Sequence, residues 1–165
     1  MDKVEAIEMM RAELIKMVNE RCDALIQVIQ KGECEKIPGL NVLEYGLAWS
    51  TPSVLKGKKP LAVKFRDGDR IETNTWKKVA QTILEDCNSD QDRHERLMQL
   101  RGIITGKQRI LLGKDSGVMD VPLKIDEELY FEAKFDTESL LNVLVQKILE
   151  PVGYDYNRAV IEYKN

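Results

Sequence analysis

The chain has one histidine, three cysteines and no apolar run that approaches 18 residues. Because His94 is the single histidine, a zinc site built on several histidines is excluded. A Ser-His-Asp triad would have to use His94 as its base. His94 stands among charged neighbours at 92–96, which is typical of the surface of a polar helix. Cys22, Cys34 and Cys87 are odd in number and lack CxxC spacing, which favours reduced thiols over disulfides or a zinc site. We therefore expect no cofactor.

Length and composition set further bounds. The chain has 165 residues, of which 43% are hydrophobic and 32% charged, enough for one moderate core. No stretch suits a transmembrane helix, and the opening MDKVEAIEMMRAELIK has acidic residues where a secretion signal needs an apolar core. We therefore expect a soluble, cytoplasmic protein that does not bind a membrane.

Charge is unevenly distributed along the chain. Residues 56–114 contain fourteen Lys or Arg against eight Asp or Glu, and residues 115–165 contain five against eleven. A net charge of +6 is therefore followed by one of −6, although the whole chain has a net charge of only −3. A basic surface attracts phosphates and acidic partners, whereas an acidic surface repels nucleic acid and can imitate it. This polarity is the strongest functional signal in the sequence.

The N-terminal segment predicts one long amphipathic helix within residues 1–33. Residues 2–31 contain neither Gly nor Pro and are rich in good helix formers, and Gly32 offers a cap. A heptad with Ile7 at position a has Arg21 as its charged exception and places five candidate oligomerisation residues on one seam: Ile7, Met10, Leu14, Met17 and Val28. We expect this helix to join two chains as a homodimer; alternatively, its apolar stripe docks on the chain's own core.

The rest of the chain predicts an α+β fold. Residues 34–60 form a connector interrupted by prolines and glycines, within which 42–49 can form a strand. Residues 61–165 carry a hairpin signal at Asp67-Gly68-Asp69, helix starts near Thr75, Asp90 and Asp136, and a closing strand at 159–163. We expect a long N-terminal helix followed by a largely antiparallel sheet with about three packed helices.

The basic segment supplies the first candidate site. Its cations come from a loop, a hairpin and two helices that follow one another in the sequence, so they are expected to share a face. The candidate nucleic-acid-binding residues are Lys58, Lys59, Arg66, Arg70, Lys77 and Arg96. They predict a non-enzymatic, self-associating protein that binds DNA or RNA. The interleaved acidic residues leave open a solvated surface with local ion pairs.

Two alternatives belong to other classes. In the first, the acidic residues imitate phosphate and the protein inhibits a nucleic-acid enzyme, such as a CRISPR effector or another host-defence nuclease. Its candidate residues are Asp126, Glu127, Glu128, Glu132, Asp136 and Glu138. In the second, Glu132 and Lys134 lie on one face of a strand and, with Asp120, hold Mg²⁺ and a water as in a metal-dependent nuclease.

Several segments together carry a resemblance that extends over about residues 50–163. They are Ser50-Thr-Pro-Ser53, Lys59-Pro60, Ala62-Val-Lys-Phe65, Asp67-Gly68, Thr75-Trp76-Lys-Lys-Val79, Arg96-Leu-Met-Gln-Leu-Arg-Gly102 and Leu123-Lys-Ile-Asp126. These segments resemble a group of small proteins of Firmicute phages and mobile genetic elements that have no firmly assigned activity. The resemblance implies an accessory role, such as nucleic-acid binding, gene regulation or neutralisation of host defence, and it implies no site residues.

Overall fold

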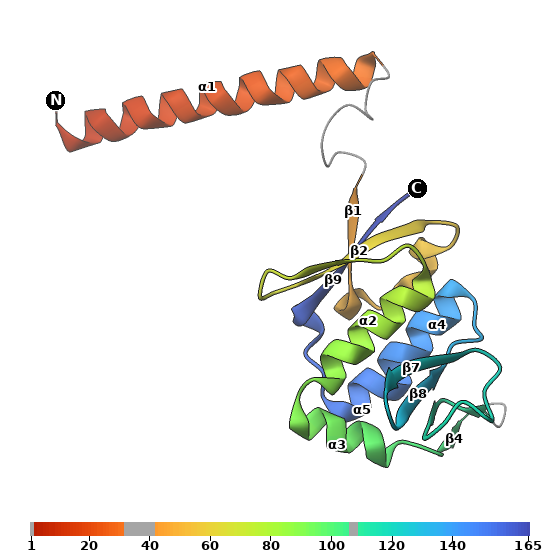
Figure 1. Cartoon of the computed structure of the whole chain (residues 1–165). Helices are drawn as coiled ribbons and strands as arrows, with labels where there is room; N and C mark the ends of the chain where they lie inside the picture. The colour runs from red at the N-terminus through yellow and green to blue at the C-terminus, as the bar shows by residue number, and fades with distance from the viewer. Residues whose placement is uncertain (1, 32–41, 106–108) are drawn as a thin grey trace. The chain divides into compact units, whose positions relative to one another are not determined.

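The structure is a computed structural model that describes residues 2–31, 42–105 and 109–165. The chain divides into two compact units, Met1–Val42 and Leu43–Asn165 (Figure 1). The second unit, called the body below, contains the buried hydrophobic core of the described residues. The body thus begins at Leu43, within the predicted connector and before the predicted start at 61. Residues 32–41, which include the predicted cap Gly32 and Cys34, lie outside the described residues.

Helix α1 runs from Lys3 to Gln30 and confirms the predicted N-terminal helix. Asp2 caps it, because Oδ1 of Asp2 accepts the backbone N–H of Glu5 at 2.7 Å. No residue of α1 is buried. Among the predicted seam residues, Val28 is half-buried, and more than half of the side-chain surface is exposed at Ile7, Met10, Leu14 and Met17.

The body is built on a four-stranded antiparallel sheet with the strand order β1-β9-β2-β3. Its strands are β1 (Leu43–Gly46), β2 (Lys59–Phe65), β3 (Arg70–Glu72) and β9 (Ala159–Lys164). β2 and β3 form the predicted hairpin, and Gly68 has a φ of +103° in its turn. β9 lies between β1 and β2, so the last strand of the chain is central in the sheet (Figure 1).

The two faces of this sheet differ in polarity. Tyr45, Ile161 and Val63 are in register across three neighbouring strands, and all three are buried. Side chains one position along each strand point to the opposite face. That face carries charged residues, including Arg70 of β3 and Glu162 of β9. One face therefore packs on the core while the other supports ion pairs.

Three helices begin where the sequence predicts them. They are α2 (Trp76–Asn88), α3 (Gln91–Gln99) and α4 (Thr137–Val143). Their N-caps are Thr75, Asp90 and Asp136, and each cap side chain accepts a backbone N–H from the first turn. Together with the sheet, these helices confirm the α+β class. Within the described ranges, no helix combines the length and hydropathy needed to cross a bilayer.

α4 continues into a π-helical turn, Leu144–Leu149 (η4), and then into α5 (Glu150–Val152). The backbone N–H of Glu150 donates to the carbonyl of Val145, five residues earlier. Pro151 has no N–H and its ring would clash with a carbonyl in a continuous α-helix, which favours the wider turn. The helix ends at Gly153, whose φ is +75°.

Short strands complete the body. A three-stranded antiparallel sheet has the order β6-β8-β7, formed by β6 (Leu112–Gly113), β8 (Leu129–Glu132) and β7 (Pro122–Asp126). β4 (Ile104–Thr105) pairs with β5 (Arg109–Ile110). α2 packs against both β2 and β7 and buries Val79, Ala80, Ile83 and Leu84. The start of α2 is thereby held beside the β2–β3 hairpin and β7.

Candidate functional site

Two of the six predicted nucleic-acid-binding residues pair with carboxylates. Nη2 of Arg66 lies 3.5 Å from Oδ2 of Asp155. Arg70 donates to Oε2 of Glu162 from Nε at 3.0 Å and from Nη2 at 2.9 Å. Both carboxylates belong to the acidic final segment of the sequence. The basic and acidic segments therefore neutralise each other at these two places.

The other four predicted residues differ in their contacts. Nζ of Lys58 donates to Oδ1 of Asn165 at 2.6 Å, and Nη1 of Arg96 donates to the carbonyl of Val152 at 3.0 Å. Val152 ends α5, where a positive charge stabilises the helix. The side chains of Lys59 and Lys77 are exposed and have no ion pair or hydrogen-bond partner in the described part of the chain. The six residues thus do not act as one set of free cations.

An open groove between the β2–β3 hairpin and the start of α2 is lined by several Lys and Arg side chains of the basic segment. Its volume is about 720 Å³, within the size range of ligand pockets. It is lined by Pro60, Leu61, Arg70, Glu72, Thr73, Asn74, Thr75, Lys77, Lys78, Gln81 and Leu123. The lining has three cations and one carboxylate, but one of the cations, Arg70, is already paired with Glu162, and the lining contains no aromatic side chain. The groove therefore suits an anion better than a flat ring.

The start of α2 borders the groove: Thr75, Lys77 and Lys78 line it, whereas Trp76 does not. Oγ1 of Thr75 accepts the backbone N–H of Lys78 at 3.1 Å, and the Thr75 carbonyl accepts that of Val79. The backbone N–H groups of Trp76 and Lys77 have no acceptor among the described residues. First-turn N–H groups carry the positive end of the helix dipole. They thus reinforce the cationic side chains.

Thr73 contributes a buried hydroxyl beside that helix start. The residue is 2% exposed, and its backbone N–H donates to the carbonyl of Leu61 at 2.9 Å. Oγ1 of Thr73 has no hydrogen-bond partner in the described part of the structure. A buried hydroxyl without a partner is costly and calls for an explanation.

The predicted acidic residues are largely engaged within the body. Oε2 of Glu138 lies 3.2 Å from Nζ of Lys56, and Oε1 of Glu127 lies 3.1 Å from Nζ of Lys124. The backbone N–H of Ser139 donates to the Asp136 cap at 2.8 Å and lowers the pKa of that carboxyl.

Asp126 and Glu128 lie at the turn between β7 and β8. Asn88 donates to Oδ2 of Asp126 at 2.9 Å and lowers the pKa of that carboxyl. The side chain of Glu128 is exposed, and its carbonyl accepts Nη1 of Arg101 at 2.9 Å. Of the predicted acidic set, Glu127, Glu128 and Asp136 are exposed.

Glu132 is buried, so it cannot belong to the predicted acidic surface. Its Oε2 accepts the backbone N–H of Asp120 at 2.7 Å, and its Oε1 accepts those of Val121 and Lys134 at 3.0 Å. Nζ of Lys134 lies 3.0 Å from Oδ2 of Asp120. Asp120, Glu132 and Lys134, the residues of the nuclease hypothesis, do lie together. The Glu132 carboxylate, however, accepts hydrogen bonds from the backbone at 120–121 and at 134.

A second polar cluster surrounds Asp86 near the end of α2. Asp86 accepts the hydroxyl of Tyr154 at 2.6 Å and two guanidinium N–H groups of Arg158 at 3.0 and 2.9 Å. Burial acts to raise the pKa of Asp86, but the hydrogen bonds from Arg158 and Tyr154 outweigh it and lower that pKa. Burial raises the pKa of Tyr154, and the Asp86 carboxylate adds to this shift. Arg93 lies 5.5 Å above the Tyr154 ring.

Of the two cysteines that the structure describes, one is buried and one is exposed, and the histidine lies among polar side chains. Burial raises the pKa of Cys87 to about 11, so its thiol is protonated at neutral pH. Cys22 is exposed on α1. Nδ1 of His94 lies 2.7 Å from Oδ1 of Asn88 and 3.7 Å from Oδ2 of Asp126. His94 is thus half-buried in a small polar cluster rather than free on a helix surface.

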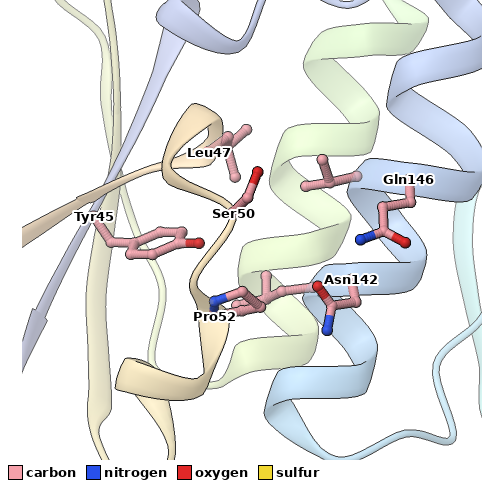
Figure 2. A pocket seen from close by; sticks show the side chains of 8 residues that line it. Tyr45, Leu47, Ser50, Pro52, Asn142 and Gln146 are labelled. Carbon is pink, nitrogen blue, oxygen red and sulfur yellow. The ribbon is translucent and has the colours of Figure 1, made fainter.

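A small pocket lies between residues 45–52 and the α4–η4 helix (Figure 2). Tyr45, Leu47, Ser50 and Pro52 line one side, and the other side includes the amide side chains of Asn142 and Gln146 (Figure 2). Its volume of about 20 Å³ holds roughly one water molecule. The pocket is too small for a ligand, and the groove beside α2 is the better candidate site.

Comparison with family models, curated proteins and solved structures found no match for this chain. The choice of candidate site therefore depends on the geometry of this structure alone. The sequence identified Lys77 and Arg70, which line the groove, and the cap signal at Thr75 predicted the helix start beside it. It did not identify Thr73, because nothing in the local sequence indicates a buried hydroxyl without a partner.

Proposed function

We propose that the chain is a non-enzymatic, self-associating protein that binds nucleic acid through the groove at the start of α2. The observation that supports this most is that Lys77 and Lys78 line one open groove, next to Arg70, which is itself paired with Glu162. Phosphate contacts by Lys, Arg and helix N-termini provide most of the non-specific affinity for nucleic acid. The phage and mobile-element context implied by the resemblance stays a prediction.

The chemistry of the groove favours a phosphate chain without base reading. Stacking on aromatic side chains is the usual means of holding single-stranded bases, and the groove lining has none. Cations and backbone N–H groups contact phosphates, which are the same in every sequence. We therefore expect binding that depends on salt and only weakly on base sequence.

The exposed seam of α1 supports self-association with a second copy. In proteins, most of the stability of a helix comes from packing its apolar face rather than from helix propensity. α1 has 28 residues, none of them buried. The seam residues repeat with heptad spacing, as in helices that pair. Two copies would bury each other's seams and present two grooves, and binding through both would raise the avidity.

Removal of groove cations tests the binding proposal. The double variant Lys77→Ala/Lys78→Ala should weaken binding to a fluorescent dT oligonucleotide. The slope of log affinity against log salt should fall by about 1.4, because two phosphate contacts are lost. Lys147→Ala is the control, since Lys147 is an exposed lysine outside the groove lining. An unchanged affinity and slope in the double variant would refute the proposal.

A charge placed on the seam tests self-association. Leu14→Asp should convert dimers to monomers, measured by sedimentation equilibrium, because a carboxylate would be buried between apolar side chains. Asn19→Asp adds the same charge to α1 outside the heptad seam and should leave the mass unchanged. If wild type is already monomeric at high micromolar concentration, the pairing of α1 is wrong.

A further inference from the structure

We infer that β3, an edge strand of the four-stranded sheet, pairs antiparallel with β3 of a second copy (Figure 1). In this pairing Ile71 faces the second copy's Ile71, and each Arg70 faces the Glu72 of the other copy. This inference rests on the proposed self-association. It adds to that association a contact made by the body rather than by α1.

The backbone of β3 has hydrogen-bonding groups that point away from the sheet. At one end of the strand, the N–H of Phe65 in β2 donates to the carbonyl of Asp69. At the other end, the N–H of Thr73 donates to the carbonyl of Leu61 in β2. Because bonded and unbonded pairs alternate in an antiparallel ladder, the N–H and C=O groups at positions 70 and 72 face outward. No described residue bonds to them, so they can pair with another strand.

The outward groups select one register for two copies. A two-fold axis through Ile71 opposes Arg70 to Glu72, and each opposed pair then exchanges both of its backbone hydrogen bonds. A shift by one residue would oppose an outward-facing residue to one that faces β2, so these bonds would be lost. A shift by two would oppose Arg70 to its own copy, or Glu72 to its own copy, and like charges at facing positions destabilise a sheet.

The charges of β3 complement a copy of the same strand. Arg70 and Glu72 are two positions apart and therefore share a face of the sheet. The Glu72 side chain is 88% exposed, and its ion pair with Arg70 of the same chain is long, at 3.8 Å. Arg70 of a second copy would give this carboxylate a directly opposed cation. β1, the other edge strand, has Glu44 as its one charged residue and so lacks this complementarity.

On the other face, Ile71 is the exposed end of an apolar row. Tyr45, Ile161 and Val63 are in register across β1, β9 and β2 and are buried. Ile71 is next in this register, and it is 42% exposed. The pair of Ile71 residues on the two-fold axis would not be hydrogen-bonded, and side chains approach most closely at such pairs. The apolar row would thus continue across both copies.

The strand pairing is a small contact that depends on α1. β3 has three residues, so two copies bury far less surface than a stable complex requires. Chains that are already held together at one contact meet at a second with a high effective concentration. The body without α1 is therefore expected to stay monomeric.

A disulfide across the axis tests the pairing in the full chain. Ile71→Cys places two thiols on opposed residues whose Cα atoms would lie about 4.5 Å apart, a distance that a disulfide spans. The bridge should form roughly tenfold faster than in the control Val54→Cys, because the paired strands hold the thiols together. Val54 is exposed to a similar extent, 49%, and lies outside β3. Peptide mass spectrometry identifies the bridged position, and equal rates would overturn the pairing.

A charge reversal tests the register. Glu72→Arg, added to the Ile71→Cys chain, would face Arg70 of the second copy and would leave the pair of Arg70 with Glu162 in place. It should slow the bridge roughly tenfold, whereas Glu44→Arg, the same change on the exposed side of β1, should stay within about twofold. A bridge that forms as fast with Glu72→Arg as without it would overturn the register.

Sedimentation equilibrium of the reduced Ile71→Cys chain separates this inference from the proposed function. Dimers that bridge no faster than the control would overturn the strand pairing and leave the pairing of α1 standing. A fast bridge that is lost together with the dimer in Leu14→Asp supports both contacts. A monomeric chain would refute the pairing of α1; a slow bridge in that chain overturns the strand pairing too, and a fast bridge supports it alone.

Discussion

Glu132 shows how a carboxylate with a catalytic sequence context can serve the fold. Three backbone N–H groups, from Asp120, Val121 and Lys134, converge on its two oxygens. A neutral amide cannot accept all three, because its NH₂ group would meet a donor. Glu132→Gln should therefore lower the free energy of unfolding by about 2 kcal/mol, measured by urea denaturation. Glu128→Gln, at an exposed side chain, is the control; equal midpoints for both variants would contradict this role.

Asp86 should make stability depend on acid pH. Its pKa is lowered in the folded state, so its stabilisation is present above the unfolded pKa of about 4 and is lost as the pH falls through the lower folded value. Asp86→Asn should lower stability at pH 7 by about 2 kcal/mol, because the bonds from Tyr154 and Arg158 lose their charged acceptor. The difference from wild type should shrink below pH 4. A constant difference from pH 7 to pH 2, measured by thermal melts, would refute the assignment.

The two described cysteines should differ in reactivity. Cys87 is buried and its pKa is raised to about 11, so little thiolate exists at pH 8. Cys22 is exposed. Iodoacetamide at pH 8 should alkylate Cys22 in the native protein and Cys87 only after unfolding, as measured by peptide mass spectrometry. Rapid native labelling of Cys87 would show that the end of α2 opens.

Among the helices and strands, the turn after α5 depends on a glycine. Gly153 has a φ of +75°, and a Cβ there would lie 3.1 Å from Nη1 of Arg96. Gly153→Ala should lower the free energy of unfolding by about 2 kcal/mol, for two reasons. Alanine is strained in the left-handed conformation, and its Cβ would displace the Arg96 guanidinium, which donates to the Val152 carbonyl. Gly57→Ala is matched in φ, at +72°, but its Cβ would meet nothing within 4 Å. It should cost only about 1 kcal/mol. Equal costs would mean that Arg96 moves away freely.

Elements with local signals were predicted well from the sequence. α1 lacks breakers, the β2–β3 hairpin has Asp67-Gly68 at its turn, and α2 has a cap at Thr75. β7 (Pro122–Asp126) was not predicted, because its proline and its charged Lys124 weaken the strand pattern. The place of β9 between β1 and β2 depends on pairing between residues roughly a hundred positions apart, which no local pattern records.

The candidate site was predicted only in part. The charge count pointed to the basic segment, and Lys77 and Arg70 do line the groove. The partners of the other cations were not predictable, because Arg66–Asp155 and Lys56–Glu138 join positions far apart in the sequence. Thr73 has no sequence signal, since an unpaired hydroxyl is a property of packing.

For the protein as a whole, α1 and the body should be separable. The compact units divide at Leu43, and the buried core of the described residues lies in the second unit. A chain of residues 43–165 should keep the thermal unfolding midpoint of the body within about 2 °C, because a loss below 0.5 kcal/mol shifts it little. It should also be monomeric. A large fall in the midpoint, measured by calorimetry, would show that the body needs residues 1–42.

The central place of β9 has a consequence for synthesis. β1 and β2 pair with β9 and not with each other. Until the ribosome has translated β9, both strands lack the strand that lies between them in the folded sheet. Non-local pairing of this kind is slow and leaves strand edges unprotected meanwhile. A nascent chain that stalls before Ala159 therefore exposes a split sheet, which makes it a target for chaperones and for aggregation.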